Sequence, residues 1–261
     1  MTRRRRSGPP RSPASHRQEP AITYINATMP IRAIGFDIDG TLYPAAALYR
    51  RLFWKSLGQL RFLIAFNGVR HDLRRLLDDP EYRSRGIDSI EGLHRFQAKL
   101  MAERLGGDPD RLYERIEAFF YTTSVEPFTT IPPFQGVTSL LDELRGLGLG
   151  LGALSDFPCD RKVELLGLAD KLDVALTSEE TGLVKPDRAS FDLLASRLGV
   201  PNGDILYVGN SERYDVRGAL GAGMRAALIT KDRKAAASSA AEFTFFDFAD
   251  LGRYIRGAIA R

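Results

Sequence analysis

The sequence contains one cysteine in 261 residues and has no long apolar run. With Cys159 alone, no disulfide can form within the chain, so we expect a reducing compartment and a cytoplasmic location. No apolar stretch approaches the ~20 residues that a membrane-spanning helix requires, so we expect no membrane segment. The apolar fraction of 44% and the charged fraction of 27% are typical of a globular protein.

Histidine is scarce as well, and the excess positive charge is confined to one end of the chain. The three histidines, His16, His71 and His94, lack the spacing of a paired metal site. Residues 1–28 hold six arginines and one glutamate. Their net charge of 6 − 1 = +5 exceeds the net charge of +4 of the whole chain. The remainder is close to neutral, so we expect no nucleic-acid binding by the folded part.

Residues 1–28 are rich in Arg, Pro and Ser, which predicts a disordered basic tail. One explanation is that translation starts at Met29, just before the first apolar run. An organelle transit peptide, or a basic arm that contacts acidic partners, is an alternative.

Two aspartates directly after the first apolar run are the clearest chemical signal in the chain. Residues 31–36 predict a buried strand, and Asp37 and Asp39 follow it, with Gly40 behind them. Carboxylates two apart on extended backbone point the same way and repel each other unless a cation or a proton lies between them. Mg²⁺, which binds carboxylate and phosphate oxygens, fits that place and indicates phosphoryl chemistry. A plain Asp-Gly turn is the alternative.

The rest of the chain predicts an α/β core with a helical insertion. Residues 45–130 show helical spacing of apolar residues and little strand character. From residue 131 on, short apolar runs alternate with helical patterns, which predicts a Rossmann-like parallel sheet covered by helices on both faces, in three layers. We therefore expect a core domain of residues 29–44 and 131–261 and an all-helical domain of residues 45–130. Further strands are expected at 149–154, 174–177, 205–208, 226–229 and 243–246, and helices at 136–145, 161–168, 189–198, 216–222 and 251–259.

Three later groups of polar residues fall at loops of this predicted sheet. Ser155 ends the second predicted strand, Lys185 precedes a predicted helix, and Asn210 and Asp215 follow the strand at 205–208. Because the carboxyl ends of parallel strands share one edge, we expect these side chains to lie near the two aspartates. Each also has a structural alternative, since a serine can cap a helix, a lysine can be solvated and an aspartate can favour a helix N-terminus.

Taken together and in order, these motifs resemble those of the haloacid dehalogenase-like superfamily, whose members are mostly magnesium-dependent phosphatases. Residues 37–41, Asp-Ile-Asp-Gly-Thr, resemble the nucleophile motif, and Ser155 the phosphate-binding hydroxyl. Lys185 resembles the family's lysine, and residues 209–215 its acidic metal motif. The insert at 45–130 lies where the family carries a helical cap.

The resemblance implies a role for each matched residue. Asp37 is expected to be the nucleophile that forms an aspartyl-phosphate, and Asp39 the general acid and base. Ser155, Lys185 and Thr41 are expected to bind the substrate phosphate, with Thr41 also steadying Asp39 within the loop.

A magnesium ion is expected to be held by the Asp37 carboxylate, the Asp39 backbone carbonyl, Asn210 and Asp215. Position 210 departs from the family, which commonly has an aspartate there. An amide oxygen can bind Mg²⁺ but brings no charge, so metal affinity should fall. A phosphate-binding module without turnover is therefore one alternative function, and a phosphotransferase or mutase using the same intermediate is another. A dehalogenase is disfavoured, because the dehalogenases of the family lack the second aspartate found here as Asp39.

The expected partner is a small phosphorylated molecule, and the oligomeric state is left open. Leu-Tyr-Pro at residues 42–44 resembles a subset of the family that acts on nucleoside monophosphates, and a sugar phosphate is the other candidate. The basic residues of 45–85 either attract an anionic substrate or form a solvated helix face. Trp54, Phe62 and Phe66 either stack on a substrate or pack within a helix pair.

Overall fold

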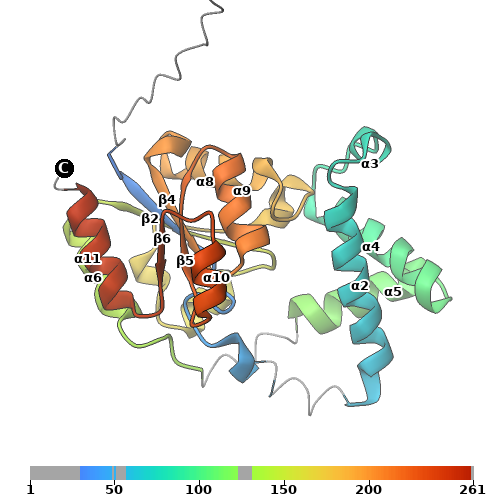
Figure 1. The fold of residues 1–261 in the computed structure, drawn as a ribbon. Helices are drawn as coiled ribbons and strands as arrows, with labels where there is room; N and C mark the ends of the chain where they lie inside the picture. The colour runs from blue at the N-terminus through green and yellow to red at the C-terminus, as the bar shows by residue number, and fades with distance from the viewer. Residues whose placement is uncertain (1–29, 49, 51–56, 123–130, 260–261) are drawn as a thin grey trace, which may run out of the picture.

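The computed structural model describes residues 30–48, 50, 57–122 and 131–259, and the predictions for residues 1–28 and Trp54 lie outside that part. Its centre is a six-stranded sheet in the order β3-β2-β1-β4-β5-β6, with every pair parallel (Figure 1). The strands are β1 (Ala33–Phe36), β2 (Gly150–Ser155), β3 (Val174–Thr177), β4 (Ile205–Gly209), β5 (Arg225–Ile229) and β6 (Phe243–Phe245). All the predicted strands are present. Because β1 pairs with β2 on one side and β4 on the other, the strand order reverses at β1, which is where such sheets bind ligands.

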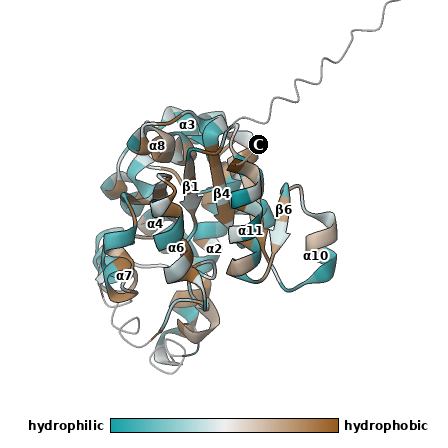
Figure 2. Cartoon of the chain, turned by 90° about the vertical axis from the view of Figure 1, so that its left-hand side faces the viewer, coloured by the Kyte–Doolittle hydropathy of each residue, from teal (hydrophilic) through white to brown (hydrophobic). Residues whose placement is uncertain are grey.

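Helices cover both faces of the sheet, as predicted. On one face, α8 (Arg188–Leu198) and α9 (Arg217–Gly221) pack on Ala33 and the residues that share its side. On the other face, α6 (Val137–Gly146), α7 (Asp160–Leu165) and α11 (Phe248–Ile259) pack on Ile34 and Phe36. The strands read as continuous apolar runs because both faces are buried, and Figure 2 shows β1 and β4 as apolar strands within the molecule. The predicted three-layer α/β fold class is confirmed.

Residues 57–122, here called the helical segment, contain helices only. They are η1 (Leu57–Gln59), α2 (Leu60–Leu76), α3 (Pro80–Ser84), α4 (Ile90–Leu105), α5 (Pro109–Ile116) and η2 (Glu117–Thr122). The helical segment lies beside the α/β layers (Figure 1) and has an apolar cluster of its own. Phe62 and Phe66 belong to that cluster and stack on Phe120, with ring centroids 5.8 Å and 3.7 Å away. For these two side chains the packing alternative is confirmed, since burial leaves them no face for a ligand.

Local sequence explains where several helices begin. Ser89 caps α4 and Asp108 caps α5, the latter followed by Pro109, which suits the first turn of a helix. α10 (Arg233–Ser238) was not predicted, because none of its residues is buried and it has no apolar periodicity.

The other short helical turns are η4 (Ala169–Lys171), η5 (Ser178–Thr181), η6 (Asn202–Asp204) and η7 (Glu212–Val216). Within the described ranges, every helix is too short or too polar to cross a bilayer.

Candidate active site

The predicted site residues meet at the carboxyl end of β1, where the strand order reverses. Asp37 is the first residue after β1, and its backbone N–H donates to Val208 of β4 over 2.9 Å. Ser155 is the last residue of β2 and is fully buried. Lys185 and Asp215 are also buried, at 3% and 2% exposed, although they come from different loops. The alternative of a solvated charge for Lys185 is therefore wrong, because its side chain is not in solvent. Asp215 does lie in the first turn of η7, as its structural alternative required, but it is buried and also pairs with Lys185.

The Lys185 ammonium lies between two carboxylates. Its Nζ donates to Asp37 Oδ1 and to Asp215 Oδ1, both over 2.8 Å, and to the Tyr207 hydroxyl over 3.2 Å. Burial by itself would disfavour the charged amine, but the two carboxylates hold the pKa of Lys185 well above its usual range. Lys185 is thus a fixed positive charge at the point where the two acidic motifs converge.

Asp37 has an unusual protonation equilibrium. Burial, together with the nearby Asp215 and Asp39 carboxylates, raises the pKa of Asp37 to about 7, although the Lys185 ammonium acts to lower it. A carboxylate nucleophile must be ionised to attack. A further cation at this point would favour that ionised form.

Thr41 contacts a different aspartate from the one predicted. Its hydroxyl donates to Asp37 Oδ2 over 2.8 Å and is fully buried, so the expectation that it steadies Asp39 is wrong. The loop turns tightly after Gly40 and returns the Thr41 side chain toward the end of β1, which brings it to Asp37. Its contact with a substrate phosphate stays a prediction.

Asp39 is held by side chains that the sequence did not indicate. Lys162 of α7 donates to both carboxylate oxygens, over 3.0 Å and 2.8 Å, and the Tyr43 hydroxyl donates to Oδ1. Ser155 Oγ donates to Oδ2 over 3.2 Å. Burial raises the pKa of Asp39, but Lys162 and these hydroxyls outweigh that and hold it below its usual range. Lys162 was missed because a lysine on a helix one turn after a strand carries no motif signal.

Asn210 also lies at this edge. Its Nδ2 donates to the backbone carbonyl of Asp39 over 2.9 Å, and its backbone N–H donates to Asp215 Oδ2 over 3.1 Å. Gly40 has φ +91°, and a Cβ there would lie 2.1 Å from Asn210 Nδ2. The glycine is therefore required both for the turn and for the close approach of Asn210.

The predicted metal ligands form a set of hard oxygen donors. The carboxylates of Asp37 and Asp215 converge on one ammonium, and the Asp39 carbonyl faces the Asn210 amide. If the Asn210 amide were rotated by half a turn, its oxygen would face the Asp39 carbonyl oxygen in place of Nδ2. Two such oxygens repel each other unless a cation lies between them. Among the residues that the structure describes, no three His, Cys, Asp or Glu side chains form a metal-binding group. The predicted ligands, two carboxylates and two neutral oxygens, are nevertheless of the kind that Mg²⁺ binds.

A buried polar network joins the helical segment to the loops beside the site. Arg70 of α2 donates to Glu179 Oε1 and, over 2.8 Å, to the backbone carbonyl of Asp156. His94 lies 3.1 Å from Glu179 Oε2, and the Tyr121 hydroxyl donates to Oε1 over 3.0 Å. Glu179 is fully buried, so its charge depends on these partners from the helical segment.

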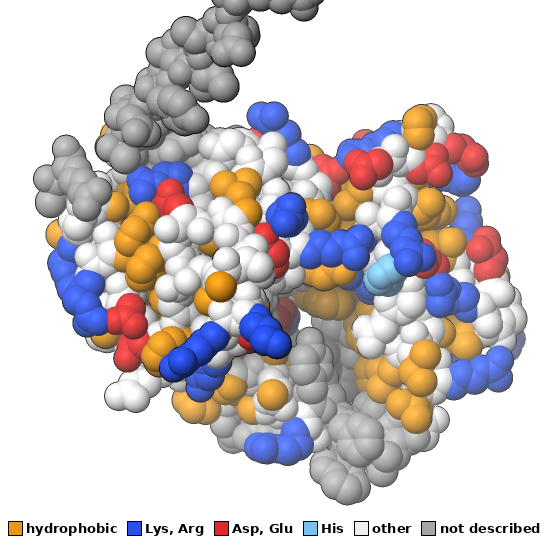
Figure 3. Space-filling model, in the orientation of Figure 1, with side chains coloured by type: hydrophobic (Ala, Val, Ile, Leu, Met, Phe, Trp, Pro, Cys, Tyr) orange, Lys and Arg blue, Asp and Glu red, His pale blue; other side chains and the backbone are white. Residues whose placement is uncertain are grey.

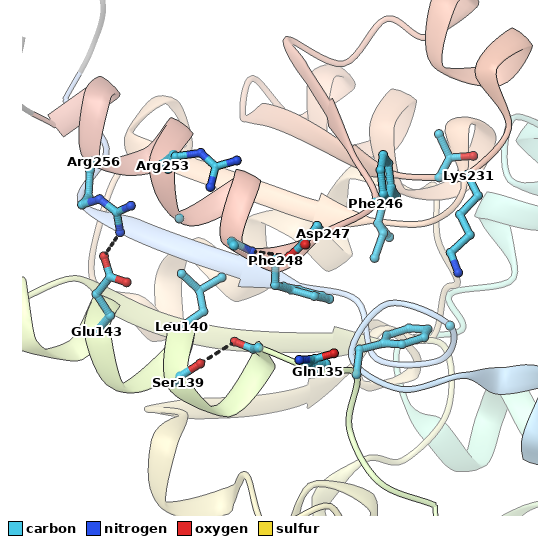
Figure 4. A pocket seen from close by; sticks show the side chains of 17 residues that line it. Gln135, Ser139, Leu140, Glu143, Lys231, Phe246, Asp247, Phe248, Arg253 and Arg256 are labelled. Carbon is cyan, nitrogen blue, oxygen red and sulfur yellow. Dashed lines mark hydrogen bonds and ion pairs between the residues drawn. The ribbon is translucent and has the colours of Figure 1, made fainter.

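The molecule has a surface hollow and a separate pocket. Figure 3 shows the surface drawn in between the α/β layers and the helical segment. A separate pocket of about 830 Å³ lies between α6, α11 and the loops after β5 and β6, and it meets the site only at Gly40 (Figure 4). The Arg256 guanidinium in that pocket pairs with Glu143, and Phe246 lies at its other end.

Cys159 is the residue directly before α7 and is 2% exposed. Burial raises the pKa of its thiol to about 12, with the nearby Asp160 adding to the effect. A thiol in that state is not a nucleophile at neutral pH.

Comparison with known proteins agrees with the geometry of the site. The family model for haloacid dehalogenase-like hydrolases matches residues 31–223. A glyceraldehyde 3-phosphate phosphatase of Methanopyrus kandleri is 30% identical over 200 residues, covering 74% of this chain and 82% of that protein. The chain therefore belongs to the haloacid dehalogenase-like hydrolase family, which confirms the predicted family and the prediction of a hydrolase.

Other relatives and solved structures extend the comparison. A pyrimidine 5′-nucleotidase of Escherichia coli is 29% identical, over 73% of this chain and 82% of that protein. A phosphatase structure from Thermococcus onnurineus has a TM-score of 0.54 at 28% identity, covering 87% of this chain and 98% of that one. An L-2-haloacid dehalogenase from Xanthobacter autotrophicus has a TM-score of 0.60 at 20% identity, covering 87% and 99%, and shows the shared fold alone.

Proposed function

We propose that this protein is a magnesium-dependent phosphatase that hydrolyses a small phosphate monoester through an aspartyl-phosphate on Asp37. The observation that carries the proposal is the convergence of Asp37, Asp39 and Lys185 at the carboxyl end of β1, with Ser155 beside them. The curated relatives, several of which are named as phosphatases, support the same class of reaction.

In the first step, an Asp37 oxygen attacks the phosphorus and the bond to the alcohol oxygen breaks. Asp39 gives a proton to that leaving oxygen. In the second step, water attacks the phosphorus, Asp39 takes the water proton, and the bond between Asp37 and phosphorus breaks to release inorganic phosphate. Lys162, which stabilises the Asp39 carboxylate, favours the form of Asp39 that takes this proton and disfavours the protonated form that the first step needs. The leaving oxygen must therefore displace Lys162 or share its contact with Asp39 in the first step.

Charge at the site explains how an anionic substrate could approach two aspartates. Lys185 and the Ser155 hydroxyl would bind phosphoryl oxygens. Magnesium, held by Asp37, the Asp39 carbonyl, Asn210 and Asp215, would supply the positive charge that offsets the charges of the nucleophile and the substrate.

The helical segment is proposed to be a cap domain, inserted as residues 45–130 into a core of residues 29–44 and 131–261. Its own apolar cluster and its place beside the sheet support this division. Arg70 and Arg74 turn toward the core, whereas Arg61 and Arg75 are exposed. Some of the basic residues of the helical segment therefore form ion pairs with the core and are not free to bind a substrate.

The substrate class follows from the relatives only in outline. The glyceraldehyde 3-phosphate phosphatase and the pyrimidine 5′-nucleotidase act on small phosphate esters by their names, so a sugar phosphate or a nucleoside monophosphate is the proposed substrate. A cytoplasmic location is part of this proposal. A phosphotransferase that uses the same intermediate is the second candidate, and it would pass the phosphoryl group to another hydroxyl instead of to water.

The test is phosphate release from purified protein with p-nitrophenyl phosphate and with a panel of sugar phosphates and nucleoside monophosphates, with and without Mg²⁺. We expect release that requires Mg²⁺ and is abolished in Asp37→Asn, which keeps the shape of the side chain but removes the nucleophile. Mass spectrometry of the denatured protein should find the phosphoryl group on the peptide that contains Asp37.

Asp192→Asn, on the exposed side of α8, is the matched control and should keep full activity. If wild-type protein binds phosphate but releases none from any substrate, the protein is a phosphate-binding module. If phosphate appears on a second sugar hydroxyl and not in solution, the protein is a phosphotransferase.

A further inference from the structure

Arg74 of α2 reaches from the helical segment into the core. Its Nη2 donates to Asp156 Oδ2 over 2.5 Å, and its Nε donates to the backbone carbonyl of Lys185 over 3.2 Å. Its guanidinium carbon lies 4.3 Å from the centroid of the Tyr214 ring. The side chain is 15% exposed, so these contacts are mostly shielded from water.

Each of these contacts is next to a predicted site residue. Asp156 follows Ser155, and Tyr214 precedes Asp215, while the third contact is with Lys185 itself. The three loops follow β2, η5 and β4 and are separate in the sequence. One side chain of the helical segment thus touches the segments that carry Ser155, Lys185 and Asp215, but not the loop of Asp37 to Thr41.

Asp156 passes the contact on to Lys185. Its Oδ1 accepts from the Lys185 backbone N–H over 3.0 Å and from the Ser178 hydroxyl over 2.8 Å. Arg74 therefore holds Lys185 twice, directly at its carbonyl and through Asp156 at its N–H. A guanidinium suits this work because its donors lie in a fixed plane, whereas a lysine ammonium is a point charge on a flexible chain.

We propose that Arg74 is a positioning residue, through which the helical segment sets the relative placement of Ser155, Lys185 and Asp215. This inference rests on the proposed phosphatase function. Arg74 contacts no reacting group and acts only through Asp156, the Lys185 backbone and Tyr214. All three contacts come from one side chain of α2, so they are present together only when α2 lies against these core segments.

The kinetic test compares Arg74→Ala, Arg74→Lys and Arg75→Ala with wild type, using p-nitrophenyl phosphate and Mg²⁺. Arg75 is the matched control, because it is the next residue of α2 and its side chain is exposed. We expect Arg74→Ala to lower kcat by about 10- to 100-fold with a smaller change in KM, since misplaced catalytic groups affect the transition state most. The kcat of Arg74→Lys should lie between the values for Arg74→Ala and wild type. The kcat of Arg75→Ala should stay within about twofold of wild type.

A second measurement does not depend on activity. Hydrogen exchange of the Lys185 backbone amide, which donates to Asp156, should be faster in Arg74→Ala than in wild type and unchanged in Arg75→Ala. If Arg74→Ala does not fold, Arg74→Lys decides, because a kcat equal to that of wild type would show that the planar guanidinium is not needed.

The inference is overturned if kcat and Lys185 exchange in Arg74→Ala match those of Arg75→Ala. It is also overturned if KM alone rises, because Arg74 would then contribute to binding instead of to positioning. If wild type releases no phosphate, the proposed phosphatase function is lost, and the exchange measurement still tests the contact between Arg74, Asp156 and Lys185.

Discussion

At the scale of single residues, Asn210 is the position that most distinguishes this site. Its amide nitrogen donates to the Asp39 carbonyl, and its backbone N–H donates to Asp215. An aspartate at position 210 would lack the amide donor to the Asp39 carbonyl. Its carboxylate would instead lie near that carbonyl oxygen and near the Asp215 carboxylate. Without a cation these oxygens repel each other, and with one they become ligands.

We therefore expect Asn210→Asp to lower the Mg²⁺ concentration for half-maximal phosphate release by about tenfold, or about 1.4 kcal/mol in binding free energy. Without Mg²⁺ the variant should have a lower Tm than wild type, and Mg²⁺ should raise its Tm by more. Asn67→Asp, which adds the same charge on the exposed side of α2, is the control. An unchanged or higher Mg²⁺ requirement would mean that Asn210 is not a ligand.

At the scale of elements, the close packing of α8 on the sheet depends on small residues in the strands. A Cβ at Gly35 of β1 would lie 2.7 Å from Leu194 Cδ2 and 2.8 Å from Tyr207 Cδ2. Tyr207 cannot move freely, because its hydroxyl contacts Lys185 and donates to the Leu154 carbonyl over 3.0 Å. The glycine in β1 thus lets α8 approach the strand that ends in Asp37.

Gly35→Ala should lower the free energy of unfolding by about 1–3 kcal/mol, because the added methyl group overpacks the contact with Leu194 and Tyr207. Gly257→Ala in α11 is the matched control, since a Cβ there meets no atom within 4 Å. That control should be neutral or stabilising by up to about 1 kcal/mol, as alanine favours helix. Urea unfolding measures both, and equal stability of the two variants would contradict the packing argument.

At the scale of the whole molecule, the helical segment and the α/β layers share buried charge. Arg70 is 3% exposed and Glu179 is fully buried, and they form an ion pair between α2 and η5. The Asp156 carboxylate is part of the same boundary, and despite its burial the pKa of Asp156 is held well below its usual range by Lys185, Arg70 and Arg74. A buried charge that loses its partner is costly, so this boundary stabilises one placement of the two parts.

Arg70→Met should therefore lower the free energy of unfolding by about 3–5 kcal/mol, because the buried Glu179 would lose its arginine partner and keep only His94 and the Tyr121 hydroxyl. The double variant Arg70→Met, Glu179→Leu should be more stable than the single variant, since both charges are then gone. Arg104→Met, which breaks a half-exposed pair with Asp72, should cost less than about 1 kcal/mol. A cost below about 1 kcal/mol for Arg70→Met, measured by urea unfolding, would contradict the importance of this ion pair.

The sequence by itself was enough to predict the sheet, its helices and the place of Asp37, Ser155, Lys185 and Asp215 at one edge. Apolar runs and glycine-rich turns are local signals, and parallel topology brings strand ends together whatever the side chains are. α10 was missed because a short exposed helix has no apolar period to detect.

Only the tertiary structure decided which side chains meet within and around the site. Lys162 and Asp39 are 123 positions apart, Arg70 and Glu179 are 109 apart, and Arg74 and Asp156 are 82 apart. Pairing over such distances depends on the packing of α7 beside the loop after β1 and of α2 against the core loops, which no local pattern predicts. Residue types and their order determined the chemistry available to this protein, and the packing of distant elements determined the partners that set its charges.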